Sequence, residues 1–148
     1  MQFLEQEILE IAEATWQSIV GMQVSSGGGT ATMPSPEGFL TGSVEISGAW
    51  NGVVLMHGAE PLIREAAAVI FGSNGDEVSH QDQLDAMYEL TNIIGGNIKS
   101  LLPEPCQLAL PKVESTTSDI LEVPGAERMS DLVFDCQGQP LYVSVWKK

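Results

Sequence analysis

The amino-acid sequence predicts an α+β fold in which an antiparallel sheet carries helices packed on one face. After a first helical segment, the order is a hairpin of two strands, two successive helical segments, a further strand and a second hairpin. A parallel sheet would instead require strands and helices to alternate along the chain. The chain has 148 residues, of which 43% are hydrophobic, so we expect one globular domain covering residues 1–148.

The first expected element is a helix over residues 3–20. Apolar residues recur there at helical spacing with glutamates between them, and Gly21 stands where a helix would stop. The segment 25–36 has three consecutive glycines and the composition of a loop. It lacks the Gly-Lys-Ser/Thr sequence and the preceding strand of a phosphate-binding loop. Residues 1–36 are therefore expected to form a helix and a flexible connection, followed by a core over residues 38–146.

A hairpin and a short helix are expected next. Two runs rich in β-forming residues predict strands over residues 39–47 and 50–57. Pro61 then lies where the first turn of a helix accepts proline, and the apolar pattern after it runs to Gly72. This helix is compact and is expected to be largely buried.

The second half of the core begins with a longer helix. Ser79 and Asp82 have the spacing of a capping box, and a helical pattern continues through Leu102 until prolines end it. After the helix we expect a strand over the sequence CQLALPKV and a long polar connection over residues 114–130. A second hairpin that turns at Gly138 would complete the sheet.

The composition of the chain disfavours several classes of function. Twenty acidic residues against six basic ones give a formal net charge of −14. A nucleic-acid partner is disfavoured, because phosphate backbones are bound by clustered Lys and Arg. The first basic residue is Arg64, unlike a secretory signal, and no apolar run approaches the ~20 residues of a membrane span. We expect a cytoplasmic protein in which Cys106 and Cys136 are buried, reduced thiols.

The residues of the long helix sort into two faces when each position advances by about 100°. One face is apolar and is expected to contact the core: Leu84, Met87, Thr91, Ile94, Ile98 and Leu101. The opposite face is a polar stripe: Gln81, Asp82, Asp85, Glu89, Asn92, Gly96 and Lys99. Periodicity alone also explains this stripe as the solvated side of an amphipathic helix.

Two residues of the polar stripe argue for a function. Asn92 and Gly96 are poor helix formers, and Gly costs about 1 kcal/mol relative to Ala at an exposed position in a helix. Selection for a function at these two positions would explain why the less stable helix is kept. Gly95 and Gly96 together would also let another backbone approach the helix, and packing of Gly95 against a neighbouring helix is an equal alternative.

The stretch DAMYELTNIIGGNIKSLL resembles the signature helix of the CheC/CheX/FliY phosphatases of bacterial chemotaxis. The motif of that family is Asp or Ser, three residues, Glu, two residues and Asn, which here is Asp85, Glu89 and Asn92. The single copy of the motif, the Gly-Asn pair at 96–97 and the LALP sequence ending at Pro111 favour the CheX-like branch. The resemblance covers residues 38–146 and implies a CheC/CheX-like form of the α+β fold.

The resemblance implies an enzyme that accelerates hydrolysis of the phospho-aspartate of a CheY-type receiver domain. The partner would supply Mg²⁺, and no intrinsic cofactor or metal is expected. Asn92 would hold the attacking water, because an amide accepts and donates hydrogen bonds at once. Glu89 would contact the receiver's lysine, and the role of Asp85 stays open between a helix-dipole residue, a rim contact and catalysis. The other expected partner contacts lie on the same stripe: Gln81, Gly96 and Lys99.

Metal binding and self-association are separate questions. Asp82, Asp85 and Glu89 could collect a hard cation, but one helix face offers few convergent ligands and no histidine joins them. His57 and His80 stand alone and are expected to have structural or surface roles.

CheX-like chains form homodimers through their sheets, so the resemblance implies a dimer. The apolar terminal sequence LYVSVW is the pairing edge that this chain itself offers.

Two other classes of function stay open. A non-catalytic adaptor would keep the fold and the helix, bind a response regulator or a motility component, and tolerate loss of the Asn92 amide. A small-molecule binding domain would need a concave apolar pocket with a few convergent polar groups, and the sequence shows no sign of one.

Overall fold

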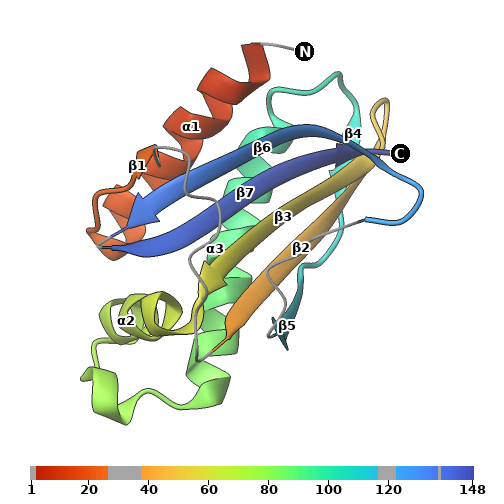
Figure 1. The fold of residues 1–148 in the computed structure, drawn as a ribbon. Coiled ribbons are helices and arrows are strands. Elements are labelled where there is room, and N and C mark those ends of the chain that lie inside the picture. The colour runs from red at the N-terminus through yellow and green to blue at the C-terminus, as the bar shows by residue number, and fades with distance from the viewer. Residues whose placement is uncertain (1–2, 27–37, 117–122, 137) are drawn as a thin grey trace.

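The computed structural model describes residues 3–26, 38–116, 123–136 and 138–148, and they form a sheet with helices behind it (Figure 1). Within these residues the sheet has seven strands, and every pairing is antiparallel. The strands run in the order β1, β6, β7, β3 and β2, and both β4 and β5 pair with β2 at the far edge. Their bounds are β1 Ser25–Ser26, β2 Phe39–Gly48, β3 Gly52–Ala59, β4 Cys106–Leu108, β5 Lys112–Thr116, β6 Glu127–Cys136 and β7 Gln139–Lys147.

Three α-helices are grouped on one face of the sheet, which confirms the expected α+β architecture. In Figure 1, α3 crosses behind the strands, α1 lies on the β6 side and α2 starts where β3 ends. The bounds are α1 Phe3–Thr15, continued by a π-helical turn over Trp16–Val20, α2 Glu60–Phe71 and α3 His80–Lys99, with a short 3₁₀ turn at Gly75–Glu77. No helix in the described part of the chain is long and apolar enough to cross a membrane.

Local signals in the sequence set the helix ends. Gly21 ends the first helical segment with φ 73°, and Gly72 ends α2 with φ 66°, a left-handed conformation that glycine adopts without strain. The expected capping box begins α3: the Asp82 amide donates to Ser79 Oγ over 3.0 Å, and the Ser79 amide donates to Asp82 Oδ2 over 3.1 Å. The helix itself ends at Lys99, and the chain continues to the expected end at Leu102 as turns.

Four expectations about the strands are wrong. Ser25 and Ser26 form strand β1 beside β6, where a flexible connection was expected over 25–36; residues 27–36 of that connection lie outside the described residues. The segment CQLALPKV forms two strands, β4 and β5, because residues 109–111 interrupt the regular pairing with β2, although the Ala109 amide still donates to the Glu45 carbonyl oxygen. The polar connection expected over 114–130 is shorter at both ends, since β5 reaches Thr116 and β6 begins at Glu127. The sequence LYVSVW is no edge: β7 lies between β6 and β3, and residues 141–146 are all buried, as a strand covered on both faces requires.

The main core lies between the sheet and the helices. Its largest fully buried side chains include Trp16 of the π-helical turn, Met87, Leu90 and Ile94 of α3, and Phe134 of β6. A second, smaller cluster of Val53, Leu55 and Trp146 occupies the opposite face of the sheet, where Val123 and Ala126 pack over it. The sheet is therefore buried on both faces near its centre, and α3 keeps one face in the core.

Both cysteines are free thiols, as expected, but only one is fully buried. Cys136 is buried and Cys106 is half-buried. Burial, first, and the negative charges of Asp135 and Glu65, second, together raise the pKa of the Cys136 thiol to about 11.

Candidate functional site

The outer face of α3 carries the polar stripe that the sequence predicts. Gln81, Asp85, Glu89 and Asn92 are exposed, whereas Asp82, Gly96 and Lys99 are half-buried. The opposite face is buried against the sheet and the other helices, as expected for Met87, Thr91, Ile94 and Ile98. Leu84 and Leu101 were assigned to that apolar face and are half-buried at its margin, and Leu101 follows the last residue of the helix.

Glu89 and Asn92 are the two members of the stripe whose polar groups are unengaged. Both side chains are exposed, and neither forms a hydrogen bond or ion pair with any other residue that the structure describes. Residues three apart on a helix have their Cβ atoms about 5–6 Å apart on the same face. A carboxylate and an amide are therefore displayed side by side to solvent.

Asp85 and Gln81 are coupled to each other at the N-terminal end of the stripe. The Gln81 amide donates to Asp85 Oδ1 over 2.9 Å, one helical turn away. The dipole role considered for Asp85 is weak, because the helix starts at His80 and the dipole effect fades beyond the first turn. Asp82 holds the first-turn acidic position instead.

The C-terminal end of the stripe is tied to the edge of the sheet. Lys99 Nζ donates to the carbonyl oxygen of Cys106 over 3.3 Å, so its ammonium group is already engaged within the chain. A Cβ on Gly96 would lie 3.8 Å from Leu108 Cδ2, which is ordinary contact and leaves room for a small side chain. Lys99 and Gly96 thus border the stripe beside β4.

Gly95 has a packing role, but its neighbour is a strand and not the helix considered from the sequence. A Cβ on Gly95 would lie 2.5 Å from Val44 Cγ1 of β2. The missing side chain therefore lets α3 sit close to the sheet. This requirement depends on a residue about fifty positions earlier in the chain, so no local signal around Gly95 indicates it.

Neither histidine belongs to the polar stripe, although His80 is the first residue of α3, and both have partners on strands. His57 is buried, its Nδ1 is 2.7 Å from Thr41 Oγ1, and its ring stacks on Phe39 at 4.4 Å between centroids. His80 Nε2 is 3.3 Å from Ser115 Oγ. In the part of the chain that is described, no group of three or more His, Cys, Asp or Glu residues is placed to hold a metal ion.

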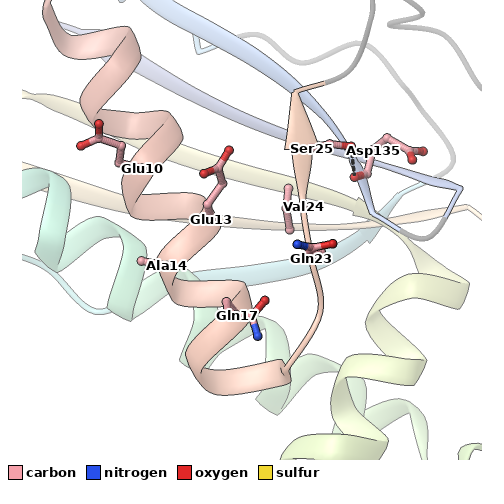
Figure 2. A pocket seen from close by; sticks show the side chains of 8 residues that line it. All are labelled: Glu10, Glu13, Ala14, Gln17, Gln23, Val24, Ser25 and Asp135. Carbon is pink, nitrogen blue, oxygen red and sulfur yellow. Dashed lines mark hydrogen bonds between the residues drawn. The ribbon is translucent and has the colours of Figure 1, made fainter.

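Two grooves were not anticipated from the sequence. Figure 2 shows one of about 930 Å³ between α1 and β1, lined by Glu10, Glu13, Ala14, Gln17, Gln23, Val24, Ser25 and Asp135. A second groove of about 530 Å³ lies on the sheet face away from the helices, with Leu55, Val113 and the 78% exposed Leu110 in its lining. Neither is lined by any residue of the polar stripe.

Comparison with protein families identifies the chain. The family model described as "Chemotaxis phosphatase CheX" matches residues 40–136, which include all of α3. The chain belongs to the CheX family. The resemblance inferred from Asp85, Glu89 and Asn92 is therefore confirmed for the family, while the roles of these residues stay predictions.

Solved structures with the same fold include CheX proteins of several bacteria. CheX from Vibrio vulnificus matches with a TM-score of 0.79 and 16% identity over 98% of this chain and 96% of that one. CheX from Desulfovibrio desulfuricans matches with a TM-score of 0.76 and 19% identity over 99% of both chains. The CheX-CheY-BeF₃-Mg²⁺ complex from Borrelia burgdorferi matches with a TM-score of 0.70 and 13% identity over 97% of both. A search of the curated proteins finds no match. The CheX fold thus extends over α1, outside the matched family region.

Proposed function

We propose that this CheX-family chain is a phosphatase that accelerates hydrolysis of the phospho-aspartate of a CheY-type receiver domain. One observation carries the proposal: Glu89 and Asn92 are exposed and unengaged on adjacent turns of a helix whose other face is fixed in the core. Membership of a family described as chemotaxis phosphatases supports it. The Borrelia burgdorferi complex supports a receiver as partner, because there a protein of the same fold is bound to CheY.

Asn92 is proposed to hold the attacking water. Hydrolysis of an acyl phosphate needs little covalent help, so a catalyst can act by placing water in line with the leaving oxygen. The side-chain amide accepts one hydrogen bond from that water through its oxygen and donates others to the phosphoryl oxygens through its nitrogen. Asparagine does not titrate near neutral pH, so this role imposes no pH dependence of its own.

Glu89 is proposed to anchor the receiver beside the reacting group. Its carboxylate is a charged acceptor for a lysine ammonium, and such charge-assisted contacts are stronger than neutral ones. Asp85 and Gln81, linked to each other, lie about one and two turns before Glu89 and would contact the rim of the receiver's site. Mg²⁺ would belong to the receiver, and the reaction would take place in the cytoplasm.

The decisive experiment follows the decay of a phosphorylated receiver with Mg²⁺ and substoichiometric amounts of the chain. We expect several turnovers per chain, lost in Asn92→Ala and reduced in Glu89→Ala. Asn97→Ala is the matched control, because Asn97 is an exposed asparagine of α3 outside the stripe. Receiver binding at one-to-one ratio without faster decay would overturn the phosphatase and favour a non-catalytic adaptor.

We also propose that the chain forms a homodimer through its sheet, with β5 as the contact. Among the described strands, β5 pairs with β2 alone, so it is an edge strand of the described sheet. An antiparallel pair of β5 strands centred on Val113 would set Lys112 opposite Glu114 of a second copy, twice across the two-fold axis. The exposed Leu110 lies just before this strand.

A charge-swap series tests this dimer. Lys112→Glu places like charges opposite each other and should weaken self-association on the order of 10-fold. The double variant Lys112→Glu/Glu114→Lys restores opposite charges and should restore the wild-type association, measured by sedimentation equilibrium. A monomeric wild type, or equal association of all three chains, would reject this contact.

A further inference from the structure

Thr91, the residue directly before Asn92, is an unusual occupant of the core. It is fully buried, and its hydroxyl oxygen has no hydrogen-bond partner within the described residues. Valine has nearly the same shape and would avoid burying an unpaired hydroxyl, which is costly in a protein interior. The presence of threonine at this position therefore indicates that a neighbouring group makes a specific contact with its hydroxyl.

That neighbour is Gly42 of β2. A Cβ built on Gly42 would lie 1.9 Å from Thr91 Oγ1, 2.9 Å from its Cβ and 3.1 Å from its Cγ2. The bond from the Gly42 Cα toward this position therefore carries a hydrogen that points at the hydroxyl oxygen. The Cα and Oγ1 then lie at most about 3.4 Å apart, within the range of weak Cα–H···O contacts. Only glycine fits this approach of strand and helix.

One turn further along α3 the arrangement is reversed. Gly95 has no side chain, and Val44 of β2 fills the space, with its Cγ1 2.5 Å from where a Cβ would be. A strand glycine therefore receives a helix side chain at Gly42 and Thr91, and a helix glycine receives a strand side chain at Gly95 and Val44. Two such contacts fix both the depth of α3 against the sheet and its rotation about its own axis.

We propose that Gly42 and Thr91 are positioning residues for the reaction, because they set the direction in which α3 presents the Asn92 amide. The proposal rests on the proposed function of Asn92. An amide about 6 Å from the helix axis moves by about 2 Å when the helix turns by 20°. Displacements of about 1 Å at a reacting centre can cost 100-fold in rate, so a small rotation is enough to remove turnover.

The primary test is Gly42→Ala, whose added methyl group meets Thr91 and must displace α3 at the level of Asn92. We expect kcat to fall on the order of 10-fold or more, while KM for the phosphorylated receiver changes less than about 3-fold. Removing the opposing atoms in Gly42→Ala/Thr91→Gly should recover most of kcat. Gly75→Ala is the control, because a Cβ there meets nothing within 4 Å.

Thr91→Ala is the second variant, and it is informative even if Gly42→Ala fails to fold. It keeps the helix but removes the contact with Gly42, so we expect a smaller loss of kcat with an unchanged KM. Rates are compared per folded chain, from the native fraction measured by circular dichroism. Unchanged kcat in Thr91→Ala, or a kcat in Gly42→Ala that falls only with the folded fraction, would overturn the positioning role.

A structural readout separates this inference from the proposed function. Residual dipolar couplings report the orientation of α3 relative to the sheet without any phosphatase assay. We expect a changed orientation in Gly42→Ala, the wild-type orientation in Gly75→Ala, and a partial return in the double variant. If the wild type fails to hydrolyse any phosphorylated receiver but these orientations follow, the function is wrong and the fixation of α3 stands. An unmoved α3 in Gly42→Ala rejects the fixation itself.

Discussion

The helices α1 and α3 both show acidic outer faces, yet they differ in what those faces offer. The outer side of α1 lines the larger groove with Glu10 and Glu13, and the π-helical turn that continues α1 adds Gln17 (Figure 2). These residues lie outside the region matched by the family model. The outer side of α3 lines neither groove but displays Glu89 and Asn92 from a helix fixed by close contacts with β2. Concavity and acidic charge alone therefore do not distinguish the α1 groove from the proposed site on α3. A free amide held at a fixed orientation is the stronger sign.

The largest difference is expected between two single variants, one that removes the Asn92 amide from α3 and one that removes the Gln17 amide from the α1 groove. Asn92→Ala should reduce the turnover of phosphorylated receiver on the order of 100-fold, the usual scale for losing one group that stabilises a transition state. Gln17→Ala removes an amide from the α1 groove and should change turnover less than about 2-fold. Rates come from receiver dephosphorylation under multiple turnover. Equal losses in the two variants would remove the distinction between the helices.

A smaller effect is expected from neutralising one glutamate on each helix. Glu89→Gln should lower kcat/KM about 10-fold, mainly through KM, because it removes the charge that holds the receiver's lysine. The loss should shrink as salt is added, since salt screens exposed charges. Glu13→Gln changes the net charge equally but lies in the groove, so any fall in kcat/KM there would indicate general electrostatic steering instead.

The free energy of unfolding at alkaline pH should report on the buried thiol of Cys136, which lies beside the α1 groove. Cys136 follows the groove residue Asp135, and its thiol has a pKa raised to about 11 by burial first and by Asp135 and Glu65 second. Below the pKa of the thiol in the unfolded chain, the contribution of Cys136 to the free energy of unfolding does not change with pH. Between about pH 9 and 11 the unfolded chain releases the proton and the folded chain keeps it, so stability falls by about 1–3 kcal/mol.

Cys136→Ala tests that slope by chemical denaturation at several pH values. The variant should be less stable at neutral pH because it leaves a small cavity, but its stability should fall less steeply between pH 9 and 11. Parallel slopes for wild type and Cys136→Ala would contradict the shifted pKa.

The smallest effect separates the two adjacent glycines of α3. Gly95→Ala should destabilise the chain by about 1–3 kcal/mol, because its methyl group would overlap Val44. Gly96→Ala meets only ordinary contact and should stabilise the helix by about 0.5–1 kcal/mol. Thermal melts of both variants measure the difference. Similar melting temperatures would show that the tight contact with β2 relaxes without cost.

Local signals made the helices and the first hairpin predictable. Gly72, Ser79 and Asp82 act through their immediate neighbours, so their roles are visible in a short stretch of sequence. The strand edges are different, because pairing depends on distant residues. Glu114 lies in a strand because it pairs opposite Thr41, and nothing in its own polar surroundings indicates this.

The candidate site shows the same division. The exposure of Glu89 and Asn92 follows from helical spacing, and the structure confirms it. The need for Gly95 depends on Val44, and the engagement of Lys99 depends on the carbonyl of Cys106. Periodicity within one helix cannot reveal either partner, since each belongs to a strand on the sheet.

The central position of β7 has a consequence for how the molecule forms. Gly52 of β3 pairs with Lys147 and Gly58 pairs with Leu141, so the middle of the sheet joins segments separated by the whole of α2 and α3. Closing so long a loop is slow, because its entropy is lost before the strand contacts are gained. Helix α3 can therefore form early, because its capping box is local to its own sequence. Its orientation depends on the close contacts with β2, so we expect it to become fixed only after β2 has joined the sheet.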